Sequence, residues 1–315
     1  NQAQKNLETS YKDEVVLAIL LAPCLCAFYP PAVEHIKVGF SVLEELPEWY
    51  MWLLFAGLSS AIGYRGVDKL MKFKKEVDIN KRIFCISDLH SPYQHRDALA
   101  FIKACKKKYK PTRWVCMGDE IDGSSFSFHS PDPDLDAPTK ELDLAKNFLH
   151  KLQEIVPDMM FLHSNHGSLL YRRRKQHMLP EQMIKDYADV LEVDKKRWTW
   201  HPHILIKSKW GSFYFIHNLN KDCVKSAQAL GYDGYVQSHF HSVYTCTYFS
   251  TPESLKWACT IGSMIDKDSM AFAYSRNGSL ARPVLGCLLI NKGIPHLIPM
   301  RLLKGGRWDG ELTQI

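Results

Sequence analysis

The stretch RIFCISDLH, residues 82–90, decides how the rest of this sequence is interpreted. Apolar and β-branched residues at its start are followed by Asp88 and His90. A short apolar run of this kind predicts a buried strand. Ligands of open α/β sheets gather at the carboxyl ends of the strands. The sequence therefore predicts a carboxylate and an imidazole side by side at the edge of a sheet.

Four further segments repeat the pattern of an apolar run followed by side chains that can bind metals. The runs at 114–117, 159–162, 211–216 and 234–237 are followed, in that order, by Asp119, by Asn165 and His166, by His217, and by His239 and His241. Helical patterns at 97–108 and 148–155 separate the first three strand-like runs. This alternation predicts a layered α/β domain.

The side chains in these five segments form a consistent ligand set. Carboxylate, imidazole and amide groups suit Mn, Fe or Zn. Two such ions held ~3.5–4 Å apart can clamp the attacking and leaving oxygens of a phosphate ester. Taken singly, a buried histidine is more often a hydrogen-bonded core residue, and an aspartate after a strand is often a helix cap. Five segments in this order favour one binuclear metal site.

With these motifs, the chain resembles the calcineurin-like metallophosphoesterase superfamily over about residues 82–300, especially members from tailed phages. The resemblance implies a four-layer α/β/β/α sandwich and a hydrolase that attacks phosphate esters with a metal-activated water. It also implies two divalent ions. The first would be held by Asp88, His90 and His241, the second by Asn165, His217 and His239, and Asp119 would bridge them. His166 would be the catalytic residue that assists the leaving group, and Asp122 would lie behind the ligands.

Four positions depart from the family pattern. Ser164 stands where glycine usually precedes the Asn-His pair, and Gly167 stands where an acidic residue usually follows it. Asn218 and Ser238 also occupy positions where glycine is common. The acidic residue missing at Gly167 would normally orient or charge the neighbouring His166.

A basic run suggests the substrate. Arg172, Arg173 and Arg174 follow the Asn-His pair by a few residues, and guanidinium groups bind phosphate in a bidentate manner. We expect them to bind substrate, and Tyr171 could stack on a base. This favours a phosphodiester of DNA, RNA or a nucleotide. The alternative for the arginines is a solvated surface run. The alternative functions of the protein are a phosphomonoesterase or phosphoprotein phosphatase, and a catalytically silent, holin-like membrane protein of a lysis system that keeps the fold.

The first quarter of the chain is of a different kind. Residues 15–33 and 49–64 carry no charge, which predicts a transmembrane hairpin. The loop between them is acidic, and lysines and arginines follow the second stretch, so both ends and the catalytic domain are predicted to be cytoplasmic. The hairpin weakly resembles holin-like phage modules. Its alternative is a pair of buried helices in a cytoplasmic protein. We expect a hairpin and linker at 1–79 and the catalytic domain at 80–315.

Composition sets wider bounds. The 315 residues are 46% hydrophobic and 12% aromatic, which excludes a wholly disordered chain. The formal charge of +6 permits an anionic partner without requiring one. Nine cysteines are dispersed without a CxxC pair, which is typical of free thiols in a reducing compartment.

Overall fold

The computed structural model describes residues 29, 31, 33–35, 38, 80–128, 132–269 and 282–315. The chain divides into two units, Asn1–Glu76 and Val77–Ile315, and the second carries the sheets described below. The predicted membrane stretches at 15–33 and 49–64 lie outside the described residues, apart from positions 29, 31 and 33. In the described part of the chain, no helix combines the length and the apolar character that crossing a bilayer requires.

The first sheet has six strands in the order β11-β10-β1-β2-β3-β4. Its parallel part comprises β1 (Arg82–Ile86), β2 (Arg113–Cys116), β3 (Met159–Leu162) and β4 (Trp198–His201). Two antiparallel strands, β10 (Gly286–Asn291) and β11 (Ile294–Pro299), extend it beside β1. The parallel strands are connected by the helices α6 (Ala98–Tyr109), α7 (Pro138–Ile155), α8 (Leu169–Gln176) and α9 (Tyr187–Leu191) and by the 3₁₀ turns η1 (Ser124–Phe126) and η2 (Glu181–Met183).

The second sheet has five strands in the order β5-β6-β7-β9-β8. They are β5 (Ile204–Ser208), β6 (Gly211–Phe215), β7 (Gly234–Gln237), β8 (Thr245–Ser250) and β9 (Leu255–Thr260). Helix α10 (Cys223–Leu230) connects β6 to β7. Asp222 begins this helix by accepting a hydrogen bond from the backbone N–H of Lys225, and Gly231, with φ 75°, ends it in the left-handed conformation.

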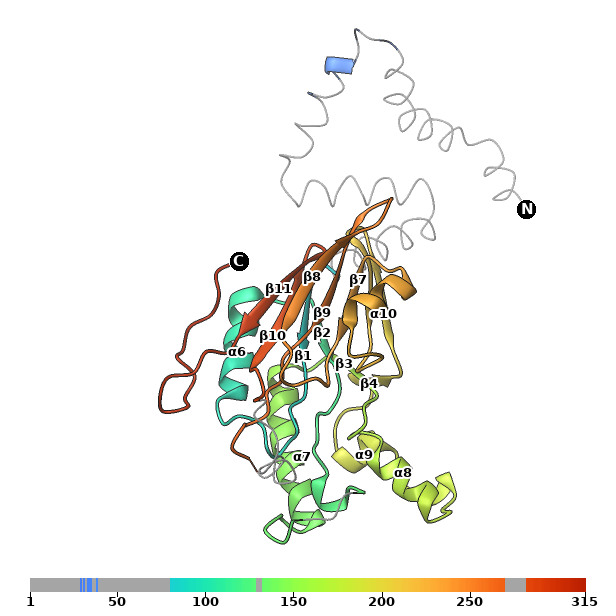
Figure 1. Ribbon diagram of the computed structural model, residues 1–315, viewed down its shortest axis with the longest axis vertical. Helices are drawn as coiled ribbons and strands as arrows, with labels where there is room; N and C mark the ends of the chain where they lie inside the picture. Colours follow the sequence, from blue (N-terminus) through green and yellow to red (C-terminus); the bar gives the residue numbers. More distant parts are fainter. Residues whose placement is uncertain are drawn as a thin grey trace, which may run out of the picture. The chain divides into compact units, whose positions relative to one another are not determined.

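Side chains alternate between the two faces of the first sheet along each strand, and both faces are buried. On β1, Phe84 and Ile86 pack with the helices α6 and α7, whereas Ile83 and Cys85 pack against the second sheet. On the outer face of the second sheet, Tyr235 packs with α10. The order of layers is therefore helices, sheet, sheet, helix, as Figure 1 shows. Burying each large apolar side chain stabilises this arrangement by about 1.5–3 kcal/mol.

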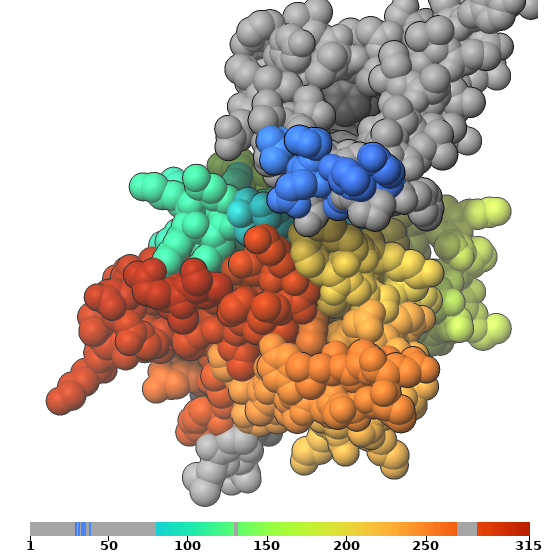
Figure 2. All heavy atoms as spheres, turned by 90° about the horizontal axis from the view of Figure 1, so that it is seen from above, coloured from blue at the N-terminus to red at the C-terminus, as the bar shows by residue number. Residues whose placement is uncertain are grey.

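The predicted α/β class is confirmed. The strands expected before the five ligand segments are β1, β2, β3, β6 and β7, each within one residue of the predicted bounds. The helix expected at 148–155 is longer than predicted, because a proline at its first turn lets it begin at Pro138. Beyond β11, the C-terminal residues lie against α6, where Tyr109 donates a hydrogen bond to the carbonyl of Thr313 (Figure 2, red against green).

Candidate metal centre

The candidate ligands lie on sharp turns that directly follow the strands. Of the eight non-glycine residues with positive φ in the described part of the chain, four are Asp88, His90, Asp119 and His239. Such backbone conformations are costly and cluster at functional sites. Gly118, with φ 105°, is required for close packing, because a Cβ there would come within 2.6 Å of the side chain of Ser164.

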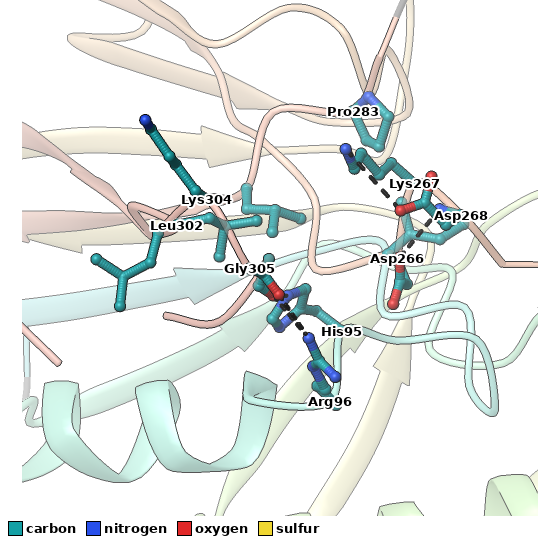
Figure 3. A pocket seen from close by; sticks show the side chains of 13 residues that line it. His95, Arg96, Asp266, Lys267, Asp268, Pro283, Leu302, Lys304 and Gly305 are labelled. Carbon is teal, nitrogen blue, oxygen red and sulfur yellow. Dashed lines mark hydrogen bonds and ion pairs between the residues drawn. The ribbon is translucent and has the colours of Figure 1, made fainter. Parts of the chain in front are cut away.

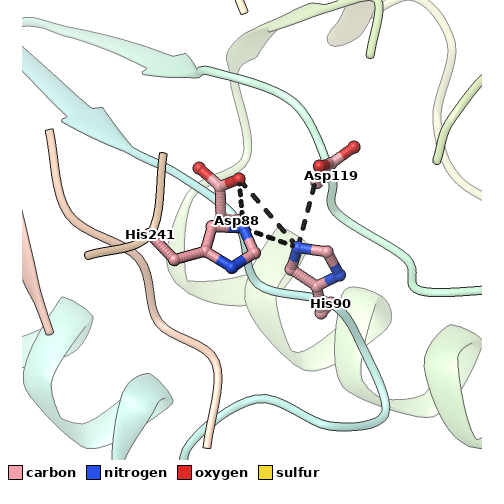
Figure 4. Close-up of side chains that lie close together, drawn as sticks. All are labelled: Asp88, His90, Asp119 and His241. Carbon is pink, nitrogen blue, oxygen red and sulfur yellow. Dashed lines mark hydrogen bonds and ion pairs between the residues drawn. The ribbon is translucent and has the colours of Figure 1, made fainter. Parts of the chain in front are cut away.

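A first group of side chains converges where β1 and β2 end. Asp88, His90, Asp119 and His241 each bring a ligand atom within 4.8 Å of the others (Figure 4). Nε2 of His241 lies 3.0 Å from Oδ1 of Asp88 and 3.2 Å from Nε2 of His90. Two imidazole nitrogens that face each other can share only one proton. This arrangement suits a cation that accepts electron pairs from both.

A second group shares Asp119 with the first. Asp119, His217 and His239 also bring ligand atoms within 4.8 Å of one another. Nε2 of His217 lies 2.8 Å from Oδ1 of Asn165. Nδ1 of His217 donates to the carbonyl of Met117 at 2.7 Å, which leaves Nε2 as the ligand atom. All seven residues predicted to bind metal are thus brought into two adjoining groups.

Asp119 connects these two groups. Its Oδ2 lies 3.7 Å from Nε2 of His90 and 3.3 Å from Nε2 of His217. This oxygen is buried and has no hydrogen-bond partner among the described residues. Its Oδ1 accepts a hydrogen bond from the backbone N–H of His166 at 3.1 Å. A buried carboxylate oxygen that accepts no hydrogen bond is costly unless nearby positive charge compensates it. Divalent cations on either side would do so, and the donor set therefore fits a binuclear centre.

Asp119 and His217 each stabilise the charged form of the other. Burial disfavours the ionised form of Asp119, but the neighbouring His217 holds the pKa of this carboxyl well below its ordinary value. Burial likewise disfavours a charged His217, but the Asp119 carboxylate raises the pKa of this imidazole to about 9. In the metal-free protein, a proton on His217 therefore offsets the charge of the Asp119 carboxylate. Metal binding must displace this proton.

Asp122 holds two histidines. Its Oδ1 lies 2.7 Å from Nδ1 of His90, which directs Nε2 of that ring toward the first group. Its backbone carbonyl accepts a hydrogen bond from Nδ1 of His166. The side chain of His166 is 25% exposed, so Nε2 remains available to a substrate. Asp122 therefore contacts both His90 and His166 and orients the two rings.

A buried carboxyl lies beside the unusual Gly167. A Cβ on Gly167 would be 3.7 Å from Oε1 of Glu120 and 3.6 Å from the hydroxyl of Tyr187. Glu120 is 1% exposed and accepts a hydrogen bond from the indole N–H of Trp200 at 3.0 Å. Burial raises the pKa of Glu120. Sequence reasoning missed this residue, although its position next to Asp119 is the one signal that could have identified it.

The three arginines predicted to bind substrate behave differently. Arg172 donates to the backbone carbonyl of Asn165 at 2.8 Å, and its guanidinium lies 5.1 Å from the ring of Phe128. Arg173 donates to the carbonyls of Phe126 and Ser127, which fixes the loop after η1. Arg174 pairs with Glu181 at 3.4 Å. All three arginines thus make contacts within the chain, but Arg172 is the exposed one of the three and lies next to a candidate ligand.

A separate cavity of about 410 Å³ is lined by residues 95–96, 265–268, 283, 285 and 302–306. Figure 3 shows His95, Arg96, Asp266 and Lys304 among the side chains that line it. The residues that form this cavity include none of the candidate metal ligands. Two of its lining residues bond to neighbouring segments, because the N–H groups of His95 and Asp266 donate to the carbonyls of Met264 and Tyr93.

Comparisons with solved structures give several matches of low sequence identity. Vps29 of Chaetomium thermophilum is 14% identical, with 74% of this chain and 96% of that chain covered and a TM-score of 0.40. An archaeal phosphodiesterase is 11% identical, with coverages of 69% and 99% and a TM-score of 0.38. The phosphoesterase YfcE of E. coli is 13% identical, with coverages of 72% and 96% and a TM-score of 0.35.

A comparison with the sequences of curated proteins gives no match. The family model for calcineurin-like phosphoesterases matches residues 81–260, more than half of the chain. This range contains both groups of converging carboxylate and imidazole side chains. The chain therefore belongs to the calcineurin-like phosphoesterase family.

Proposed function

We propose that this protein is a phosphoester hydrolase that requires two divalent metal ions. The observation that carries the proposal is the buried Oδ2 of Asp119, which lies between His90 and His217 and lacks a hydrogen-bond partner among the described residues. In this proposal, Asp88, His90 and His241 would hold one ion, and Asn165, His217 and His239 would hold the other. Asp119 would contribute to both sites. The donor set suits Mn, Fe or Zn.

The chain's own residues then have distinct tasks. Bound divalent ions would neutralise the phosphate and lower the pKa of a nucleophilic water. His166 is held through Nδ1 by the carbonyl of Asp122, so Nε2 is free to donate a proton to the departing alkoxide. Proton donation by a positioned side chain contributes about 10²–10⁴-fold to a rate. Asp122 keeps both His90 and His166 in the required orientation.

We further propose that the substrate is a phosphodiester of a nucleic acid or nucleotide. Arg172 donates to Asn165, and the exposed ring of Phe128 lies 5.1 Å from its guanidinium and 4.4 Å from that of Arg173. A cation beside an exposed ring suits a phosphate followed by a base, because arginine binds the phosphate and the ring stacks on the base. Tyr171, 48% exposed on the same helix, offers a second ring.

Hydrolysis of two phosphodiesters and two phosphomonoesters tests the substrate class. The purified chain with added manganese should hydrolyse bis-p-nitrophenyl phosphate and short single-stranded oligonucleotides faster than p-nitrophenyl phosphate or a phosphopeptide. A clear preference for the last two would identify a phosphomonoesterase or phosphoprotein phosphatase. His166→Ala serves as the control: it should lower kcat for the diester by about 10²-fold or more while the metal content stays unchanged.

We also propose, from the sequence alone, that residues 15–33 and 49–64 tether the catalytic domain to the cytoplasmic face of a membrane and that the protein is of the phage type. The uncharged stretches and the basic residues that follow them support the tether. Membrane fractionation of the full chain tests it. Recovery of the whole chain in the high-speed supernatant without detergent would refute the tether.

A further inference from the structure

Cys246 and Cys259 lie directly opposite each other on the antiparallel strands β8 and β9. In an antiparallel pair, facing residues alternate between hydrogen-bonded and non-hydrogen-bonded pairs. The backbone N–H groups of Trp257 and Ile261 both donate to the β7 side, to Asp233 and Gln237. Cys259 lies midway between them in the strand, so its backbone also faces β7. Cys246 and Cys259 therefore form a non-hydrogen-bonded pair.

The hairpin turn gives the same result. At its end, the N–H of Thr251 donates to the carbonyl of Ser254 at 2.9 Å, so these two form a hydrogen-bonded pair. The two types of pair alternate along the strands, and Cys246 and Cys259 lie five positions from the turn pair Thr251 and Ser254. Cys246 and Cys259 are therefore a non-hydrogen-bonded pair. In such pairs the Cα atoms are about 4.5 Å apart. Disulfides need Cα atoms about 4.4–6.8 Å apart, so the backbone already has the spacing that a disulfide requires.

The two thiols differ in their surroundings. Cys246 is partly exposed on β8, which is the edge strand of its sheet, whereas Cys259 is fully buried between the sheets. The β8–β9 hairpin lies on the surface seen in Figure 2, in orange. A hydrogen bond from Cys259 lowers the pKa of the Cys246 thiol, and burial raises the pKa of Cys259. Cys246 is thus the accessible thiol and the better nucleophile, and Cys259 is placed to resolve its product.

We propose that Cys246 and Cys259 form a reversible redox site that reacts with small disulfides such as oxidised glutathione. The Cys246 thiolate attacks one sulfur of the small disulfide, whose S–S bond breaks and releases one thiolate. Cys259 then transfers its proton to a thiolate base, and its sulfur attacks Cys246 in the mixed disulfide. The second small thiol leaves. The protein loses two electrons and two protons, and the small disulfide gains both.

The site lies beside the candidate metal centre but does not depend on it. Strand β8 begins at Thr245, four residues after His241, and β9 ends at Thr260, four residues before Met264, whose N–H donates to the carbonyl of Asp88. A disulfide would fix these two strands to each other next to a ligand segment. Its formation can be measured by mass, whether or not the protein is an active phosphoesterase.

The sequence allows a direct mass-spectrometric test. Cleavage after lysine and arginine separates the neighbouring cysteines, because Cys85, Cys223, Cys246 and Cys259 fall in the peptides 83–96, 222–225, 226–256 and 257–267. The native full chain is incubated with oxidised glutathione, its free thiols are alkylated, and it is digested at mildly acidic pH. We expect a linked pair of peptides 226–256 and 257–267 that is lost on reduction with dithiothreitol.

Three variants complete the test. Cys259→Ser should stop the reaction at a glutathione adduct on Cys246, and Cys246→Ser should leave Cys259 unmodified. Cys223→Ser is the matched control and should form the same linked pair as the wild type. The proposal is overturned if the folded wild type gives only a glutathione adduct, if peptide 226–256 becomes linked to another cysteine, or if the link forms only after denaturation.

Discussion

Oδ2 of Asp119 lies 3.3 Å from Nε2 of His217, and both atoms belong to buried side chains. The first atom comes from the loop after β2 and the second from the loop after β6, so this contact joins the two sheets. It brings a carboxylate from one sheet to a histidine of the other. The centre therefore exists only when both sheets are packed, and metal binding and folding should stabilise each other.

Asp122 should determine metal affinity without binding a metal. We expect Asp122→Asn to weaken metal binding by about 10–100-fold, because the amide no longer holds Nδ1 of His90 as a carboxylate does at 2.7 Å. Titration of the metal-free protein with Mn²⁺ by calorimetry measures this. Ser124→Ala, which removes a hydroxyl bonded to the other oxygen of Asp122, should have a smaller effect. Equal effects of the two substitutions would contradict the orienting role.

Arg172 should contribute to nucleic-acid binding more than its neighbour Arg174. Arg172→Gln should weaken binding of a single-stranded oligonucleotide and reduce the slope of log K against log salt by about 1, because one phosphate contact is lost. Arg174→Gln is the matched control, since this side chain is 10% exposed and pairs with Glu181. Fluorescence anisotropy at several salt concentrations compares the two. Identical losses would indicate a general charge effect.

Glu120 should stabilise the loop that carries the Asn-His pair. Glu120→Ala leaves the indole N–H of Trp200 without its acceptor and should lower the free energy of unfolding by about 1–3 kcal/mol. Glu120→Gln keeps an acceptor oxygen, and burial already favours the uncharged carboxyl, so it should cost less. Urea unfolding of both variants tests this. A glutamine variant as unstable as the alanine variant would show that the hydrogen bond to Trp200 does not account for the loss of unfolding free energy.

The contact between Asp97 and the C-terminal residues should stabilise the fold in a pH-dependent manner. Nε and Nη2 of Arg307 donate to this carboxylate at 2.8 and 2.6 Å and lower its pKa from 3.8 to about 2. Because the unfolded chain binds the proton more tightly, ionised Asp97 stabilises the fold above about pH 4. This contribution is lost as the pH falls toward 2.

Asp97→Asn should therefore cost about 1–2 kcal/mol of unfolding free energy at pH 6. The difference from the wild type should shrink between pH 4 and pH 2, as followed by urea unfolding in the presence of a chelator. Asp158→Asn, which removes an exposed pair with Arg197, is the control and should cost less than about 1 kcal/mol. A difference that stays constant down to pH 2 would contradict the assigned pKa.

Much of the fold could be predicted from the sequence because its key strands are short apolar runs that end in polar residues. Runs such as Met159–Leu162 are buried on both faces, and this leaves a clear signal. The edge strands β8 and β11 were not predicted, since exposed and buried residues are mixed along them. Their place depends on pairing with β9 and β10, and these two strands pair in turn with β7 and β1, which lie further away in the sequence.

The candidate ligands could be predicted for a related reason, since each directly follows a strand. The hydrogen-bond partners that orient these residues could not be predicted. The bond from Nδ1 of His217 to the carbonyl of Met117 joins residues one hundred positions apart. Glu120 reaches Trp200 across eighty positions. In the sequence pattern, Arg172, Arg173 and Arg174 are equivalent, and only their contacts in the folded chain distinguish them.

Metal stoichiometry with and without the Asp119 carboxylate tests the central claim most directly. The purified full chain, reconstituted with Mn²⁺ and desalted, is analysed by inductively coupled plasma mass spectrometry, and hydrolysis of bis-p-nitrophenyl phosphate is measured on the same samples. We predict two ions per chain for the wild type. For Asp119→Asn, we predict a loss of affinity beyond the roughly 100-fold expected for residues that only orient ligands, with a matching loss of activity. A wild-type chain that binds no metal, or an Asp119→Asn variant that retains both ions and full activity, would contradict the account.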